Sequence, residues 1–397
     1  MSKIITDEKA IEEFLTRGIE NIYPNKEFLK KQLLSGKRLT MYMGVDPTGP
    51  TLHLGHCIPI KKLGEFQKLG HRAILLIGDF TAMIGDPTDK TAARKKLTRA
   101  QVMSNCKLYK KQASTFLDFG WGGAELKYNS KWLGKLSFQE VLELASNLTY
   151  AQTIKRSMFQ DRIANDKDIY LNEFMYPMMQ GYDSVAMDVD GEIGGNDQTF
   201  NMLVGRDLLK KLKNKEKFVL ATKLLEDSSG KKMGKTEGNM VSLLDDNNQM
   251  FGKIMSWTDG MIVGGFELCT DVSMDEIRVI EQDLQKGINP KEHKLKLAYE
   301  IVKIYYGAKK AGEAMNEWQK TFSQKEMPTD IPTIKPTNYD ILTVLVEAKM
   351  SPSRGEARRN IEQKGVRVNE ADITDDKLVL KAGDVVQKGK RFFVKVI

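Results

Sequence analysis

Cysteine and histidine are scarce in this chain. Among its 397 residues there are three cysteines and four histidines. Cys57, Cys106 and Cys269 are odd in number and far apart, so neither a disulfide framework nor a zinc site built from paired cysteines is expected. Free thiols are typical of a reducing compartment, and the cytoplasm is therefore the expected location.

Long apolar runs are missing as well. The densest apolar patch, residues 73–77, is far too short to cross a bilayer, and no apolar segment follows a basic start as in a signal peptide. We therefore expect neither a membrane span nor a secretory signal. Charge, by contrast, is abundant, with 61 Lys and Arg residues against 53 Asp and Glu residues and a net charge of +8. This excess favours a polyanionic partner, although an even scatter of surface lysines would give the same total.

The order of apolar runs predicts the architecture of the first part of the chain. Short β-rich runs at residues 39–45, 73–79 and 217–220 alternate with longer helix-period stretches such as residues 98–119. This alternation is typical of βαβ units. We therefore predict an α/β catalytic domain over residues 1–246, with a Rossmann-like, doubly wound parallel sheet.

The pattern then changes to helices alone. Segments such as residues 274–286 and 291–306, each followed by a glycine, predict an all-helical domain over residues 247–325. Prolines at four-residue spacing mark residues 326–338 as a linker, because proline can neither continue a helix nor join the interior of a sheet. Residues 339–397 form the last predicted domain. A chain of this length usually has more than one hydrophobic core, which agrees with several domains.

The first motif with chemical meaning follows the expected strand at residues 39–45. Turn-forming residues 46–51 lead to His53 and His56, which open a helix. In a doubly wound sheet, ligands bind at the carboxyl ends of strands, where the next helix offers N–H groups to phosphate. Two histidines three apart can donate to one phosphate chain, and Gly55 between them would let a nucleotide lie against the backbone. A surface pair at an ordinary helix cap would look the same, whereas a zinc pair lacks a third ligand.

A basic, glycine-punctuated loop at residues 228–238 is the second motif. Lys232 and Lys235 would neutralise charge that develops on a pyrophosphate leaving group. Alone, a solvated basic turn explains this loop equally well. Together with the histidine motif, however, its signature part 230–238 resembles the paired signatures of the class I aminoacyl-tRNA synthetases. The resemblance implies ATP as a substrate with Mg²⁺, no tightly bound cofactor, and no metal held by the protein.

Four further stretches resemble the tyrosyl branch of that class, of the bacterial type, so the similarity runs along the whole chain. They are residues 42–48, 84–88, 176–183 and 194–198. The resemblance implies that tyrosine is bound by Tyr42, Asp86, Tyr176, Gln180, Asp183 and Gln198. It implies that ATP is bound by Gly44, Asp46, Gly55, Asp197 and Lys235. It implies that the catalytic residues are Thr48, His53, His56, Lys232 and Lys235.

The residue types suit that assignment. A phenolic hydroxyl both donates and accepts, so a carboxylate beside a hydroxyl satisfies it, and phenylalanine would leave these groups unpaired. Tyr176, Gln180 and Asp183 stand at spacings of four and three, which places them on one helix face. An amphipathic core helix would give the same spacing, and Asp86 before Pro87 is also a common turn.

The C-terminal segment, residues 339–397, reads as two short helices followed by strands at 366–368, 377–381 and 391–396. It resembles the small α+β RNA-binding domain of a ribosomal small-subunit protein, which bacterial tyrosyl enzymes carry at this end. The arginine fork suits phosphate, and a solvated basic helix is the alternative. The predicted RNA-binding residues are Arg354, Arg358, Arg359 and Arg367.

The predicted function is therefore that of the tyrosyl-tRNA synthetase family. Tyrosine and ATP would give tyrosyl-adenylate and pyrophosphate, and tyrosine would pass to the 3′ end of tRNA. The resemblance also implies a homodimer. Three alternatives remain at this point: a tryptophanyl enzyme, a nucleotidyltransferase with a similar histidine motif, and a non-catalytic RNA-binding relative. Tyr42 with Asp183 argues against the first, the C-terminal regions against the second, and the intact signatures against the third.

Overall fold

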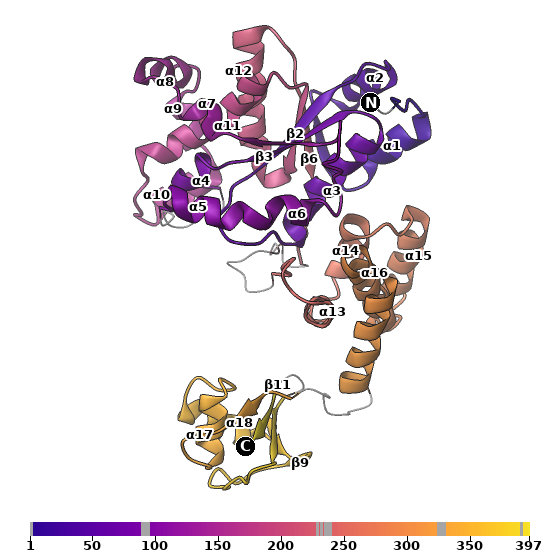
Figure 1. The fold of residues 1–397 in the computed structure, drawn as a ribbon, viewed down its shortest axis with the longest axis vertical. Helices are drawn as coiled ribbons and strands as arrows, with labels where there is room; N and C mark the ends of the chain where they lie inside the picture. The colour runs from indigo at the N-terminus through magenta and orange to yellow at the C-terminus, as the bar shows by residue number, and fades with distance from the viewer. Residues whose placement is uncertain are drawn as a thin grey trace. The chain divides into compact units, whose positions relative to one another are not determined.

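The chain consists of two compact units in the computed structural model. They are Met1–Ala311 and Gly312–Ile397 (Figure 1). The boundaries predicted from sequence divide the chain more finely, and they stay predictions. None of the described helices is long and apolar enough to cross a membrane. The structure describes residues 3–88, 96–227, 230, 233, 240–323, 331–389 and 392–397.

A six-stranded sheet organises the first unit, in the order β1-β6-β5-β2-β3-β4. Its strands are parallel except β1, which is antiparallel to β6. From β2 the chain moves outward to β3 and β4 and then returns to β5 and β6 on the other side of β2. The predicted doubly wound sheet is thus confirmed, and its order reverses between β2 and β5. The strands are β1 Ile19–Tyr23, β2 Thr40–Val45, β3 Arg72–Ile77, β4 Glu125–Tyr128, β5 Gly191–Gly195 and β6 Phe218–Thr222.

Both faces of the sheet are buried. Consecutive strand residues point to opposite sides, and the residues on each side pack in a hydrophobic cluster. On β2, Met41 and Met43 belong to the core that α3 (Leu54–Lys68) shares with the sheet. Tyr42 between them packs in a separate cluster on the other face. That face is covered by α11 (Leu171–Met187), whose Ser184 hydroxyl lies 3.0 Å from the Tyr42 hydroxyl.

The helix predicted over residues 98–119 is not continuous. It consists of α5 (Arg99–Asn105), a 3₁₀ turn and α6 (Tyr109–Ala113). Asn105 donates to the Pro47 carbonyl at 2.9 Å, and the Tyr109 hydroxyl donates to the Gly49 carbonyl at 2.7 Å. These bonds tie the broken helix to the turn that precedes the histidine motif. The other helices of the sheet region are α1 Glu8–Thr16, α2 Lys26–Leu34, α4 Thr81–Ile84, α7 Ser130–Leu133, α8 Phe138–Ala145, α9 Tyr150–Ile154, α10 Ser157–Ala164 and α12 Thr199–Lys213.

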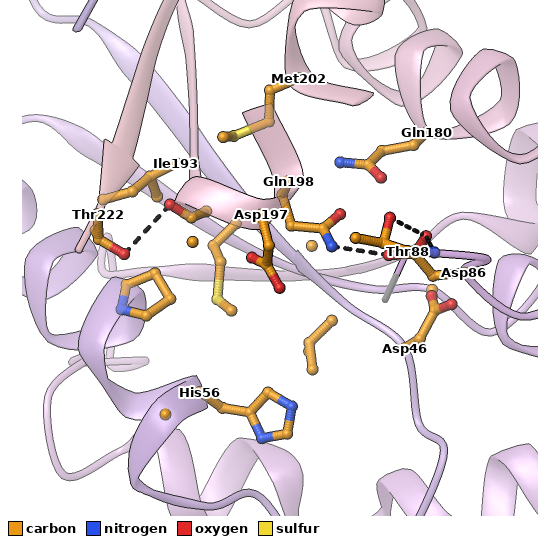
Figure 2. A pocket seen from close by; sticks show the side chains of 18 of the residues that line it. Asp46, His56, Asp86, Thr88, Gln180, Ile193, Asp197, Gln198, Met202 and Thr222 are labelled. Carbon is orange, nitrogen blue, oxygen red and sulfur yellow. Dashed lines mark hydrogen bonds between the residues drawn. The ribbon is translucent and has the colours of Figure 1, made fainter. Parts of the chain in front are cut away.

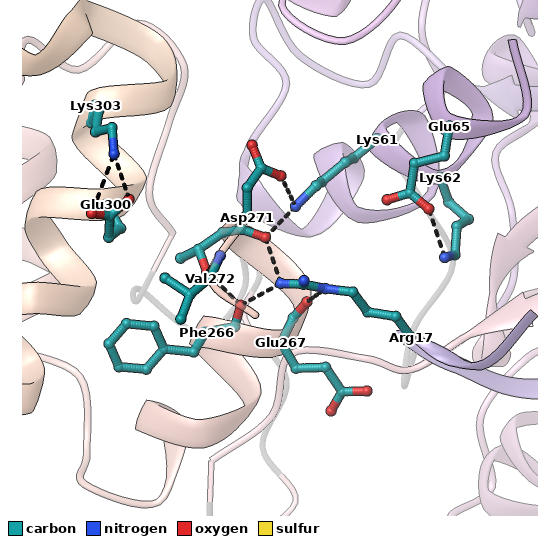
Figure 3. Close-up of polar contacts among 11 residues, drawn as sticks. Arg17, Lys61, Lys62, Glu65, Phe266, Glu267, Asp271, Val272, Glu300 and Lys303 are labelled. Atoms are coloured by element: carbon teal, nitrogen blue, oxygen red, sulfur yellow. Dashed lines mark hydrogen bonds and ion pairs between the residues drawn. The ribbon is translucent and has the colours of Figure 1, made fainter. Parts of the chain in front are cut away.

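The described residues from 247 to 323 form helices and no strand, as the sequence predicted for this region. The helix α14 is fastened to the sheet region at its C-terminal end, where the last carbonyls of a helix lack partners within it. Arg17 donates to the carbonyls of Phe266, Glu267 and Thr270 at 3.3, 3.0 and 2.7 Å (Figure 3). Lys61 of α3 donates to the Thr270 carbonyl and pairs with Asp271. The helices here are α13 Asn247–Met255, α14 Met261–Cys269, α15 Met274–Gln285 and α16 Lys291–Ser323.

The second unit is α+β, as predicted, and has its own hydrophobic core. A five-stranded sheet in the order β7-β11-β10-β8-β9 packs with α17 (Ile341–Glu347) and α18 (Arg354–Glu362). The predicted strand at 377–381 is wrong, since only Val379 forms a single bridge, with Asp340. An edge strand, β7, lies within the stretch predicted as a linker, and edges tolerate proline. The strands are β7 Thr333–Ile334, β8 Val366–Val368, β9 Ala371–Asp372, β10 Val385–Lys388 and β11 Phe392–Val396.

Candidate active site

A cavity of about 410 Å³ lies at the carboxyl ends of β2 and β5, where the order of the sheet reverses (Figure 2). Ligands of open α/β sheets bind at such a point. Two predicted residues, Lys232 and Lys235, lie outside the described residues. All the other predicted tyrosine-binding, ATP-binding and catalytic residues line the cavity: Tyr42, Gly44, Asp46, Thr48, His53, Gly55, His56, Asp86, Tyr176, Gln180, Asp183, Asp197 and Gln198.

The two histidines stand at the start of α3, as the sequence predicted. His53 is the residue before the first turn, and the two imidazole rings are 3.7 Å apart between centroids. The N–H of His53 donates to Nδ1 of His56 at 3.2 Å. A neutral His56 therefore carries its proton on Nε2, which makes Nε2 a hydrogen-bond donor.

The chain that follows the second motif lies beside the first motif. Residues 241–243 run along residues 52–54, where the N–H of Leu54 donates to the Val241 carbonyl at 3.1 Å. Met233, which stands between the two predicted lysines in sequence, is buried and lines the cavity. Segments far apart in sequence therefore meet at one wall of the pocket.

Asp46 begins the turn after β2, and both of its carboxylate oxygens accept hydrogen bonds. Its Oδ1 accepts from the Thr81 hydroxyl at 2.7 Å, and its Oδ2 accepts from the Tyr176 hydroxyl at 3.0 Å. A Cβ atom on Gly78 would lie 2.0 Å from Asp46 Oδ1, so only glycine fits there. The result is a carboxylate fixed between β2 and α11.

Asp86 lies on the opposite side of the cavity from His56 (Figure 2). Its Oδ1 accepts from the Thr88 N–H at 2.9 Å and the Thr88 hydroxyl at 2.7 Å, and its Oδ2 accepts from Gln198 at 2.8 Å. Arg156 in turn donates to the Thr88 hydroxyl at 2.7 Å. A nearly buried carboxylate held in this way can receive a cationic group of a ligand.

Asp183 is a third carboxylate of the cavity and is buried on α11. Its oxygens accept from Trp132 Nε1 at 2.7 Å and from Asn129 Nδ2 at 3.3 Å. Burial raises the pKa of Asp183 well above its usual range, while these two donors oppose the rise. The sequence reasoning missed Trp132 and Asn129. Their position directly after the carboxyl end of β4 is the signal that would have found them.

Tyr42 faces Asp183 from β2 and is completely buried. Burial raises the pKa of its phenol well above the usual range, so the hydroxyl keeps its proton. Beneath it lies a buried ion pair of Glu192 and Lys217, which the sequence reasoning also missed. Charged residues are rarely buried unless they are paired, so Glu192 within the buried strand β5 is the signal that could have indicated such a pair.

The predicted RNA-binding arginines lie on the second unit. Arg354, Arg358 and Arg359 are exposed on α18, and Arg367 is on β8. Three of them pair with aspartates at the surface, Arg354 at 2.9 Å, Arg358 at 2.6 Å and Arg367 at 2.5 Å. Such exposed pairs contribute about 0–1 kcal/mol, so exchanging the aspartate for a phosphate costs little.

Two family models together cover nearly the whole chain. The model described as tRNA synthetases class I (W and Y) matches residues 34–323. The model described as the SYY-like C-terminal domain of tyrosine–tRNA ligase matches residues 319–395.

Curated proteins and solved structures agree with this match. The tyrosine–tRNA ligase of Moorella thermoacetica is 39% identical over 391 residues, which span 96% of this chain and 94% of that protein. Tyrosine–tRNA ligase 2 of Clostridium acetobutylicum is 40% identical over 96% of this chain and 97% of that protein. The truncated mitochondrial tyrosyl-tRNA synthetase of Coccidioides posadasii superposes with a TM-score of 0.62 at 27% identity. The match covers 78% of this chain and 90% of that one. The tyrosyl-tRNA synthetase structure from Archaeoglobus fulgidus shares the fold, with a TM-score of 0.61 at 20% identity. The match covers 78% of this chain and 100% of that one.

Proposed function

The chain belongs to the class I tRNA synthetases for tryptophan and tyrosine, and on this premise we propose how its pocket binds and activates tyrosine. It is an aminoacyl-tRNA ligase that forms tyrosyl-adenylate and pyrophosphate from tyrosine and ATP and then charges tRNA. This function was predicted from the sequence and is confirmed. The tryptophan alternative is not favoured, because the full-length relatives are named for tyrosine.

The observation that carries the proposal for the pocket is a pair of carboxylates, each suited to one end of tyrosine. At the buried end, Asp183 would accept the substrate's phenolic proton while Tyr42 donates to the phenolic oxygen. Phenylalanine would leave both groups unpaired in a buried site, which disfavours it. At the other end, Asp86, Tyr176 and Gln180 would hold the ammonium group. All three residues line the same cavity as Tyr42 and Asp183, which supports this orientation.

ATP would bind at the start of α3. Gly44 and Gly55 would let the nucleotide lie close to the backbone, Asp197 would contact its ribose, and Asp46 would bind it as well. That all four line the cavity supports this assignment. Gln198, whose amide nitrogen reaches Asp86, would meet the substrate's carboxylate end. The tyrosine carboxylate oxygen then forms a bond to the α-phosphorus, and the bond to the pyrophosphate oxygen breaks.

Charge on the leaving pyrophosphate would be stabilised by donors at the mouth of the pocket. We assign this role to His53, His56 and Thr48 on one side and to Lys232 and Lys235 on the other. The position of Met233 in the cavity wall, between those lysines in sequence, supports their assignment. No side-chain nucleophile takes part, because positioning and charge stabilisation supply the rate.

Mg²⁺ would arrive with ATP. Among the described residues there is no group of three or more His, Cys, Asp or Glu side chains suited to a metal ion. Magnesium commonly keeps several waters and binds substrate phosphates, so the phosphates of ATP would hold it. When bound, it neutralises charge on the phosphates. We propose that no other cofactor is held.

The remaining regions would serve tRNA. We propose that residues 247–325 recognise the anticodon region and that residues 339–397 bind RNA through the four arginines, with residues 326–338 as the linker between them. The three cysteines are free thiols, which supports a cytoplasmic location.

A homodimer is the proposed assembly. The segment of residues 138–171 exposes large apolar side chains, which supports a contact with a second copy. Exposed fractions are 77% for Phe138, 55% for Leu142, 69% for Tyr150 and 84% for Leu171. The molar mass in solution tests this, since a monomeric mass at micromolar concentration would contradict it.

The deciding experiment is exchange of labelled pyrophosphate into ATP, without tRNA, in the presence of tyrosine, tryptophan or phenylalanine. Exchange with tyrosine alone is expected. Exchange with tryptophan would overturn the assignment of Tyr42 and Asp183.

His53→Ala and Lys235→Ala test the proposed catalytic roles. Each should slow adenylate formation by about a hundredfold, the usual cost of losing one transition-state donor, with tyrosine binding nearly intact. Stopped-flow adenylation and equilibrium binding separate the two effects. Unchanged adenylation in both variants would remove the roles assigned to them.

A further inference from the structure

A buried ion pair lies directly under the proposed tyrosine site. The Lys217 and Glu192 side chains are 0% and 2% exposed, and Lys217 Nζ lies 2.5 Å from Glu192 Oε2. Burying two charges costs several kcal/mol of desolvation per ion, and apolar residues of similar size often serve stability as well. The reaction described above does not use this pair. Its location therefore calls for a role other than fold stability.

Hydrogen bonds connect the pair to two residues that line the pocket. Lys217 reaches Tyr42 through Ser184, and Glu192 binds Gln180 directly. Lys217 Nζ donates to the Ser184 hydroxyl at 2.8 Å, and that hydroxyl lies 3.0 Å from the Tyr42 hydroxyl. On the other side, Gln180 Nε2 donates to Glu192 Oε1 at 3.0 Å. Lys217 is thus connected to the residue proposed to bind the phenol, and Glu192 to a residue proposed to bind the ammonium group.

The lysine fixes the direction of the first chain of hydrogen bonds. An ammonium group only donates, so Ser184 must accept from Lys217 and has one proton left to donate. Its possible acceptors are the Tyr42 oxygen at 3.0 Å and Glu192 Oε2 at 3.4 Å, and the shorter contact favours Tyr42. With its oxygen already accepting, the hydroxyl of Tyr42 directs its own proton elsewhere, as a donor in the pocket.

The glutamate determines how the Gln180 amide is oriented. Glu192, paired with a lysine, only accepts, so it takes the NH₂ end of the Gln180 amide. The carbonyl end of that amide is left to face the cavity that Gln180 lines. A carbonyl oxygen there accepts from an ammonium group, whereas an NH₂ group would repel it.

We propose that the Glu192–Lys217 pair is a positioning device for substrate choice, which sets Tyr42 as a donor to the phenolic oxygen and Gln180 as an acceptor from the ammonium group. This inference rests on the proposed roles of Tyr42 and Gln180. Glu192 is among the residues that line the cavity, whereas Lys217 lies behind it. We assign neither of them a contact with the substrate, and each acts through a neighbour. Without the pair, Tyr42 is free to donate back to Ser184, and the preference for a phenol over a bare ring weakens.

The test compares tyrosine with phenylalanine in pyrophosphate exchange. Removing one charge alone strands the other and can prevent folding, so Glu192→Gln and Lys217→Met are combined. Ser184→Ala, which changes no charge, is made in parallel. For both, the ratio of kcat/KM for tyrosine over phenylalanine should fall about tenfold, with KM for tyrosine raised more than kcat is lowered.

A matched control is the second buried ion pair of the same unit, Arg162 with Glu173, whose side chains are 1% and 8% exposed. Arg162→Met combined with Glu173→Gln likewise removes one positive and one negative buried charge, but it leaves the contacts of Tyr42 and Gln180 unchanged. Its thermal stability should fall at least as much, and its tyrosine-to-phenylalanine ratio should stay within twofold of the parent.

Tyr42→Phe separates this inference from the function beneath it. If Tyr42→Phe lowers the ratio while the Glu192 and Lys217 double variant and Ser184→Ala leave it unchanged, the positioning role is wrong and the pocket assignment stands. If Tyr42→Phe leaves the ratio unchanged, the pocket assignment itself fails. An equal loss in the Arg162 and Glu173 control would also overturn the inference, because general destabilisation would then explain the effect.

Discussion

At the residue scale, the protonation of one buried carboxyl controls the phenol end of the pocket. Burial raises the pKa of Asp183, so it takes up a proton at a higher pH than an ordinary aspartate. A protonated Asp183 no longer accepts the substrate's phenolic proton without reorganising its bonds to Trp132 and Asn129. We therefore expect kcat/KM for tyrosine to fall as the pH drops through this raised pKa.

The stability contribution of Asp183 has the opposite sign. Because its pKa is raised in the folded state, the stability linked to this group is present below the unfolded pKa and is lost as the pH rises through the folded pKa. Asp183→Asn should be less active, with a kcat/KM profile that lacks the acid limb. An identical acid limb in this variant would assign the limb to another group.

His71, at the start of β3, predicts the acid sensitivity of the fold. It is 4% exposed, its ring stacks on Phe66, and its Nδ1 accepts from the Leu39 N–H at 3.3 Å. Burial, together with the charge of Arg38, lowers its pKa to about 4. The unfolded chain protonates near the ordinary value while the folded chain does not, so stability is lost as pH falls from the ordinary value to about 4.

This loss amounts to about 3 kcal/mol at most. Urea unfolding of the parent and of His71→Gln at neutral pH and near pH 4 measures it, and His71→Gln should lose much less stability on acidification. His293→Gln is the matched control, since His293 lies on α16 beside Asp283. Equal acid sensitivity of the parent and His71→Gln would contradict the assignment.

Sequence alone predicted the site residues that stand in turns, such as Asp46 after β2 and Asp86 after α4. Turn chemistry and the resemblance to a family both point to such positions. The sequence did not predict the Glu192–Lys217 pair, because the two residues are far apart in sequence. Only the pairing of β5 with β6 brings them together.

At the element scale, α14 depends on a residue from outside the helical region. Arg17 donates to three carbonyls at its C-terminal end and is 8% exposed. Arg17→Ala would remove a charged donor from all three carbonyls, of which that of Thr270 keeps Lys61 and that of Phe266 keeps the Thr270 hydroxyl. We expect a loss of about 2–3 kcal/mol in stability. Denaturant unfolding measures it. Arg278→Ala on α15, whose pair with Asp275 is exposed, should change stability by less than about 1 kcal/mol; comparable losses would refute the capping role.

The same scale explains which elements the sequence predicted. The strands β2, β3 and β6 were found because buried parallel strands read as short, continuous apolar runs. The helix over residues 98–119 was predicted as one piece, because hydrophobic periodicity carries no information on hydrogen bonds between side chains and distant backbone. Asn105 and Tyr109 bind the backbone of the turn after β2, and that tertiary contact breaks the helix.

At the scale of the whole molecule, the two units have separate hydrophobic cores. The core of the first unit joins α1, α2, α3 and α6 to the sheet, whereas the core of the second lies between α17, α18 and its own sheet. Every described residue of the first of these cores belongs to the first unit. The described residues that line the pocket belong to the first unit.

Deleting residues 331–397 should therefore leave tyrosine-dependent pyrophosphate exchange within twofold of the parent. Charging of tRNA, in contrast, should fall about tenfold or more, mainly through a higher KM for tRNA, because the exposed arginines of α18 are lost as phosphate contacts. The triple variant Arg354→Ala, Arg358→Ala and Arg359→Ala should fall in the same direction by less, and its tRNA binding should depend less steeply on salt concentration. If the deletion abolished exchange, the pocket would depend on the second unit; if charging were unaffected, the RNA-binding role of that unit would be wrong.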